Sequence, residues 1–200
     1  MSSLLDLVSE HISSDQIDSI SKQLGASREQ TESAIGMALP TLLGAVARKA
    51  DDDHGAAELH QTIEKEDSSV FDSLSGLLGG ASNGLQAFGG DAGGLLGNIL
   101  GGRQGRVEQG IGKASGLNAG QVGSLLSMLA PLVLGAIGKK ARGQNMDAGG
   151  LAGMLRGEKK SMENQASGGL LAGLLDQDGD GDFDFQDIMK LGMKRLFGSK

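Results

Sequence analysis

Six aspartates near the C-terminus are spaced as the oxygen ligands of a metal ion would be. They are Asp176, Asp178, Asp180, Asp182, Asp184 and Asp187. Ca²⁺ takes about six to eight oxygen ligands, and a loop of about twelve residues supplies them from its positions 1, 3, 5, 7, 9 and 12. When the loop begins at Asp176, all of these positions are aspartates; the seventh would bind through its backbone carbonyl and the ninth through water. The spacing therefore predicts a Ca²⁺ site, at which Mg²⁺ would compete.

A glycine fixes the register of this loop, because the sixth position must turn the backbone sharply. Gly181 stands there. The pattern D-x-D-x-D-G-x5-D resembles EF-hand loops, and especially dockerin loops, which commonly close with Asp. Residues 169–175 and 185–197 read as the short helices expected on either side. We expect a modest affinity, because Asp187 is one methylene shorter than the usual closing Glu and no second loop pairs with this one.

A solvated acidic turn is the alternative interpretation of the same segment. Six carboxylates so close together repel one another when no cation is present. A simple turn has no need of that repulsion, so we favour the metal site.

The composition predicts an all-α body for the rest of the chain. The 200 residues include 35 glycines and five Phe but no Trp or Tyr, so a core must consist of Leu, Ile, Val, Met and Ala. Such side chains suit closely packed helices and disfavour a β-sandwich. The net charge of −7 argues against a nucleic-acid surface, and the absence of Cys removes disulfides and thiol chemistry.

An internal repeat organises this body, since residues 20–50 align without a gap on residues 111–141. The identical pairs include Gly25/Gly116, Gln30/Gln121, Pro40/Pro131, Gly44/Gly135 and Lys49/Lys140. Each copy predicts a short helix ended by its glycine, a capping box closed by its glutamine, and a long helix kinked at its proline. We expect the two long helices to pack as a pseudo-twofold pair.

The second half of each long helix is expected to form this contact. In the first copy, Leu39, Leu43 and Val46 share one face, and Gly44 would let the partner helix approach closely. The fold class is therefore an all-α helical bundle built from a duplicated helix–kinked-helix unit, with an EF-hand-like helix-loop-helix at the C-terminus.

The repeated pattern I-x-K-x-x-G-x-[SN]-x-x-Q…P-x-[LV]-L-G-A resembles a YidB-like bacterial family of domains of unknown function, number nine-three-seven. The resemblance spans roughly residues 15–157. It implies an α-helical bacterial protein and brings no activity or catalytic residue. The acidic loop departs from the family pattern.

Four segments are expected along the chain. They are a first helical unit at 1–67, a Gly/Leu-rich connection at 68–105, a second helical unit at 106–165 and the calcium-binding helix-loop-helix at 166–200. Short apolar segments that are bounded by glycines, such as residues 149–155, predict two-turn helices. The least charged run, residues 114–138, could span a bilayer, but the matching positions of the first copy carry charges. We therefore expect a buried helix there.

Motifs of enzymes are incomplete in this sequence. Residues 80–84 match the nucleophile pattern G-x-S-x-G, but all three histidines lie upstream of it. Residues 110–114 are similar to a phosphate loop without its first glycine and its hydroxyl. We predict neither activity.

Two further binding sites are disfavoured by the sequence. Asp53, His54, Glu58 and His60 could gather a transition metal, but His60 falls on a different helix face from His54 and Glu58, so a solvated surface is favoured. A DNA-binding helix-turn-helix is disfavoured because the chain is acidic and the long helices carry few basic residues.

We therefore predict a non-enzymatic bacterial protein that binds calcium. Two alternatives stay open. One is a partner-binding or self-assembling module, with a protein partner or a homo-oligomer docking through the loop beside Phe183, Phe185 and Met189; the other, which we expect less, is membrane association through the Gly/Leu-rich helices. No signal peptide is visible, so we expect a cytoplasmic location, and secretion without such a signal stays open.

Overall fold

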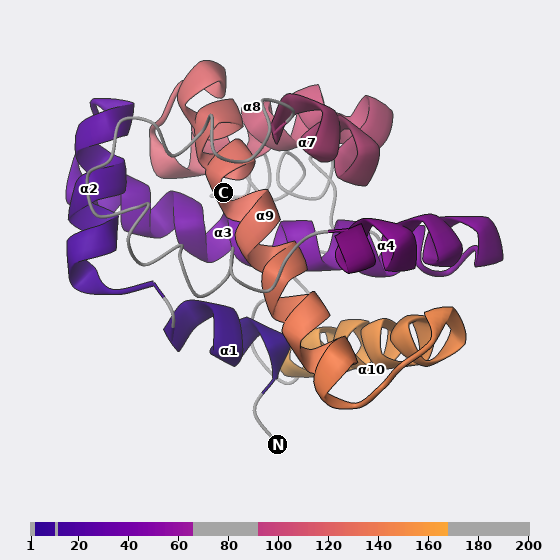
Figure 1. Cartoon of the computed structure of the whole chain (residues 1–200). Helices are drawn as coiled ribbons and strands as arrows, with labels where there is room; N and C mark the ends of the chain where they lie inside the picture. Colours follow the sequence, from indigo (N-terminus) through magenta and orange to yellow (C-terminus); the bar gives the residue numbers. More distant parts are fainter. Residues whose placement is uncertain (1–2, 11, 66–91, 168–200) are drawn as a thin grey trace, which may run out of the picture.

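The computed structural model describes residues 3–10, 12–65 and 92–167, and these ranges are helical with no strand (Figure 1). The helices are α1 (Leu4–Glu10), α2 (Ser14–Leu24), α3 (Arg28–Lys49), α4 (Asp53–Lys65), α7 (Ala92–Leu100), the 3₁₀ turn η1 (Gly101–Arg103), α8 (Gln104–Ser115), α9 (Ala119–Gly143) and α10 (Ala148–Ser167). The all-α class predicted from the composition is confirmed.

The helices fall into two series with the same order, which we call the first half (residues 3–65, α1 to α4) and the second half (residues 92–167, α7 to α10). The offset that carries residue 20 onto residue 111 also brings α1 onto α7, α2 onto α8, α3 onto α9 and α4 onto α10. The structural repeat thus extends beyond residues 20–50 and 111–141, the two segments whose sequences align.

Matching caps define the junction between the short and the long helix in each half. Gly25 and Gly116 end α2 and α8 in left-handed conformations, with φ of 62° and 80°. The Ser27 hydroxyl accepts a bond from the backbone N–H of Gln30, whose Oε1 accepts one from the backbone N–H of Ser27. Asn118 forms the same box with the glutamine three residues on. The helix ends predicted from these residues are confirmed.

Each of these glutamines also reaches across to the other half. The Gln30 Nε2 donates to the backbone carbonyl of Gly116 at 3.0 Å, and the Gln121 Nε2 donates to that of Leu24 at 2.8 Å. A helix leaves its last carbonyls without intrahelical donors, and these side chains supply the donors from outside. The two bonds are reciprocal, as a pseudo-twofold arrangement requires.

The two halves cover each other's long helix. Helix α3 is packed mainly by α7, α8 and α10 of the second half. Helix α9 is packed by α1, α2 and α4 of the first half and by α7 and α8 of its own. The two long helices also contact each other, and Figure 1 shows α9 crossing α3 near the middle of the molecule. The two long helices are thus in contact, and that the segments after the prolines form this contact stays a prediction.

The core lies along these two helices. Both continue through their prolines, and the segments after the prolines are buried, with Leu43 at 2% and Leu134 at 2% exposure. Helix α7, in the segment expected to be a connection, adds Leu96, Ile99 and Leu100 to the same core. Residues 149–155 begin the 20-residue α10, so the two-turn helix expected there is wrong.

The close approach predicted at Gly44 is also wrong. A Cβ placed on Gly44 would meet no atom within 4 Å, so its missing side chain serves no helix contact. A tight contact lies in the second long helix, one turn beyond Gly135, the counterpart of Gly44. There, a Cβ on Gly138 would come within 2.9 Å of Ile63 Cγ2 on α4. Gly138 thus lets α4 of the first half lie close against α9.

The substitution Gln30→Glu separates the two roles of this side chain, because glutamate keeps the oxygen that closes the capping box but has no N–H for Gly116. We expect it to lower the free energy of unfolding by about 0.5–1.5 kcal/mol in urea titrations, since it removes an exposed hydrogen bond and sets a carboxylate against a carbonyl. Gln121→Glu should behave alike. Gln23→Glu on the exposed side of α2 is the control; equal effects of Gln30→Glu and Gln23→Glu would contradict the cross-half role.

Candidate functional site

The six aspartates predicted to bind calcium lie outside the described residues, as does the G-x-S-x-G match at residues 80–84. They are Asp176, Asp178, Asp180, Asp182, Asp184 and Asp187. The other candidates can be placed. Residues 110–114 lie inside α8, so they form a helix and not a phosphate-binding loop.

The four side chains considered as a transition-metal site lie on α4. His54 Nδ1 is 3.4 Å from Glu58 Oε1, one turn along the helix, and Asp53 begins the helix. His60 Nε2 lies 3.1 Å from the backbone carbonyl of Met146, at the turn between α9 and α10. Across the described ranges, no three or more His, Asp and Glu side chains gather where they could hold a metal ion.

A polar cluster instead joins the ends of the long helices to their neighbours. Glu158 on α10 is its most buried member, with a side chain 13% exposed. Its Oε1 accepts a bond from Lys140 Nζ at 2.8 Å and its Oε2 accepts one from the backbone N–H of Leu4 at 3.0 Å. One carboxylate thereby ties α9, α10 and the first turn of α1 together, and a half-buried lysine receives its counter-charge.

The corresponding lysine of the first half makes a similar but more exposed contact. Lys49 Nζ donates to Glu58 Oε2 at 2.9 Å and also to Asn98 Oδ1 on α7. The bond from Lys49, and next its positive charge, lower the pKa of Glu58 below the usual value. The carboxylate is favoured in the folded state, so this contact is present at neutral pH and is lost as the pH falls through the lowered pKa.

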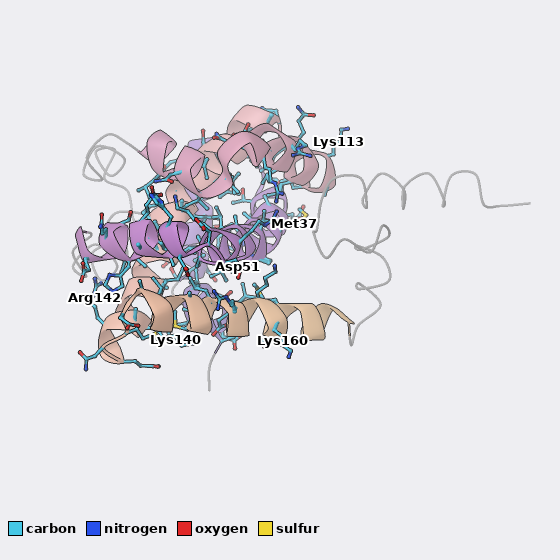
Figure 2. All side chains as sticks on the ribbon, turned by 90° about the vertical axis from the view of Figure 1, so that its right-hand side faces the viewer. Met37, Asp51, Lys113, Lys140, Arg142 and Lys160 are labelled. Carbon is cyan, nitrogen blue, oxygen red and sulfur yellow. The ribbon has the colours of Figure 1, made fainter. Side chains whose placement is uncertain are left out.

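Ion pairs and hydrogen bonds also cross between the halves on this side of the molecule. Arg156 Nε lies 3.1 Å from Asp51 Oδ1, and Lys159 Nζ lies 3.9 Å from Asp51 Oδ2. Arg142 donates to the backbone carbonyl of Ile63 at 3.0 Å. Figure 2 shows Asp51 between the layer of α3 and α4 and the layer of α10, while Lys160 points away. In each of these three contacts a cation of the second half meets an acceptor of the first.

Sequence reasoning did not identify this cluster. The identity of Lys49 and Lys140 in the repeat was a usable signal, since both lysines bind a glutamate of the next helix. The glutamates themselves do not correspond, because the offset carries Glu58 onto Gly149, while Glu158 lies nine residues further along. No spacing rule would therefore have paired them.

Helix α9 is, among the described helices, the one long and apolar enough to cross a bilayer. Length and composition alone cannot separate a spanning helix from a core helix. In this structure 61% of the most apolar 18-residue stretch of α9 is buried against the rest of the protein.

Comparison with known proteins identifies one family. The profile described as "Bacterial protein of unknown function (DUF937)" matches residues 6–140, which include most of α1, all of α2 to α4, α7 and α8, and most of α9. No curated protein and no solved structure matches the chain. The match ends before α10 and the acidic loop.

The substitution Glu158→Gln keeps an acceptor for the Leu4 N–H but removes the charge that faces Lys140. We expect it to lower the free energy of unfolding by about 1.5–3 kcal/mol, measured by urea denaturation at neutral pH, because the cation would remain half-buried. Glu58→Gln in the counterpart pair should cost less, because Glu58 itself is 47% exposed and Lys49 keeps its bond to Asn98. Equal losses in the two variants would show that burial of the pair is not what makes Glu158 important.

Proposed function

The chain belongs to the bacterial DUF937 family, for which no function is known, and we propose that its specific chemistry is Ca²⁺ binding by residues 176–187. The observation that carries this proposal is the register of the loop. Six oxygen-bearing side chains coincide with the ligand positions and Gly181 with the obligatory turn. A one-residue shift would place Gln177 first and would lose most ligands.

Each aspartate of the loop would have its own role in binding the ion. Asp176, Asp178 and Asp180 would bind through one carboxylate oxygen each, and Asp187 would close the loop. Asp182 would offer its backbone carbonyl and Asp184 a held water. Such an all-oxygen donor set suits a hard cation and gives no soft ligand to a transition metal. Because Asp187 is short, the closing contact would be weaker than that of a glutamate loop.

The helical body would act as the scaffold of this site. The loop follows α10, which ends at Ser167 and is held on α3 and α4. The described residues hold no competing group of metal ligands. Bound metal would neutralise the carboxylates and thereby order the C-terminal segment, while the core formed by α3 and α9 needs no metal for its apolar contacts.

We expect the purified chain to bind one Ca²⁺, with a dissociation constant between about micromolar and millimolar, as a single loop closed by Asp should. Titration calorimetry would measure it, and a parallel titration with Mg²⁺ would give the selectivity. Asp180→Ala should abolish binding because it removes a ligand next to the turn.

Asp53→Ala is the matched control, because it also removes one carboxylate, from the exposed start of α4. It should bind Ca²⁺ as the unaltered chain does. No saturable heat at millimolar Ca²⁺, or equal binding by Asp180→Ala and Asp53→Ala, would rule out the loop as the site. Calcium-dependent sedimentation or liposome flotation would instead indicate the docking or membrane role.

Chelation of calcium should act locally. We expect hydrogen exchange to become faster over about residues 168–197, while the amides of α3 and α9 keep their protection, because binding free energy appears where the ligands are. Protection that falls evenly along the chain would mean that the metal is needed for the whole fold. Unchanged exchange in the C-terminal segment would mean that the loop holds no metal.

A further inference from the structure

Each half of this protein lacks a complete core of its own. The long helix α3 is covered mainly by α7, α8 and α10 of the other half. Helix α9 packs on α7 and α8 of its own half, and α1, α2 and α4 of the first half complete its cover. The buried residues of both halves form a single cluster, which includes Ile20 and Leu42 of the first half and Ile111 and Leu129 of the second. A half without its counterpart would expose the apolar face of its long helix, which costs about 25 cal/mol for each Å².

The contacts that supply this cover do not depend on which chain provides them. Gln30 needs the Gly116 carbonyl, and Gln121 needs the Leu24 carbonyl, from a folded counterpart. The covalent connection between the halves is residues 66–91, which can span at most about 90 Å when extended at about 3.4 Å per residue. A domain of this size is about 40 Å across, so this connection can reach a second molecule.

We propose that the partner that fits this internal interface is a second copy of the chain, with the first half of one molecule paired to the second half of the other. The exchange would repeat the reciprocal glutamine bonds and the Asp51–Arg156 ion pair between molecules. Two copies would close into a dimer in which every half is paired. This property is separate from calcium binding.

The charges of the halves decide which pairing is favoured. Residues 3–65 carry eleven acidic and five basic side chains, whereas residues 92–167 carry four acidic and nine basic. Two first halves would bring like charges together, and so would two second halves. Pairing of unlike halves is attractive, and Asp51 between Arg156 and Lys159 is a local instance of it. Exchange therefore preserves the native pairing of halves and changes only the chain that supplies each one.

Single cysteines can test the exchange cleanly, because the chain has none of its own. Asp51→Cys and Arg156→Cys mark a pair that crosses between the halves, 3.1 Å apart. Asp18→Cys and Arg28→Cys mark a pair of the same residue types within the first half, 2.8 Å apart and similarly exposed. The two variants of each pair are mixed, unfolded and refolded together, and then treated with a short bis-maleimide.

The cross-half mixture should give covalent dimers at least several-fold above those of the same-half mixture, and more at higher protein concentration during refolding. The reason is that exchange places residue 51 of one molecule beside residue 156 of another, but never residue 18 beside residue 28 of another. Each variant refolded alone gives the background of random collisions. Equal yields from the two mixtures, or a cross-half yield at background, would overturn the proposal.

Discussion

The reciprocal bonds of Gln30 and Gln121 are the constraint on which the arrangement of this protein depends. Each glutamine satisfies a backbone N–H at the start of its own long helix and a backbone carbonyl at the end of a short helix in the other half. The part-buried carbonyl of Leu24 needs such a partner, because an unpaired backbone group loses its bond to water without replacement. Two side chains therefore set the position of each helix junction against the other.

Around these bonds, polar contacts differ between the two ends of the long helices. At one end the neutral amide bonds match in both halves. At the other, Lys140 and Lys49 hold corresponding places but meet glutamates of different burial, and Glu158 alone also caps α1. The symmetry is thus kept at the capping boxes and the glutamine bonds, and it is relaxed at the lysine–glutamate pairs. The two halves also differ in net charge, because the first is acidic and the second is basic.

Much of the local structure could be predicted because it depends on residues close together in the sequence. The left-handed Gly25 and Gly116 and the two capping boxes involve groups at most a few residues apart. The packing could not be predicted in the same way. The close approach at Gly138 depends on Ile63 of another helix, and the expectation for Gly44 failed because helix rotation decides which glycine faces a neighbour. The candidate metal loop was found from ligand spacing alone, and that interpretation stays a prediction.

The interleaving of the halves has a consequence for synthesis of the chain on the ribosome. The bonds that lock it join residues 86, 97 and 105 positions apart, although helical proteins usually fold through short-range contacts. Translation at about 5–20 residues per second leaves the completed first half without its cover for roughly 5–20 s. During that interval the apolar side of α3 is accessible to any other nascent copy on the same message. The same interval defines when a chaperone would have to hold the emerging chain.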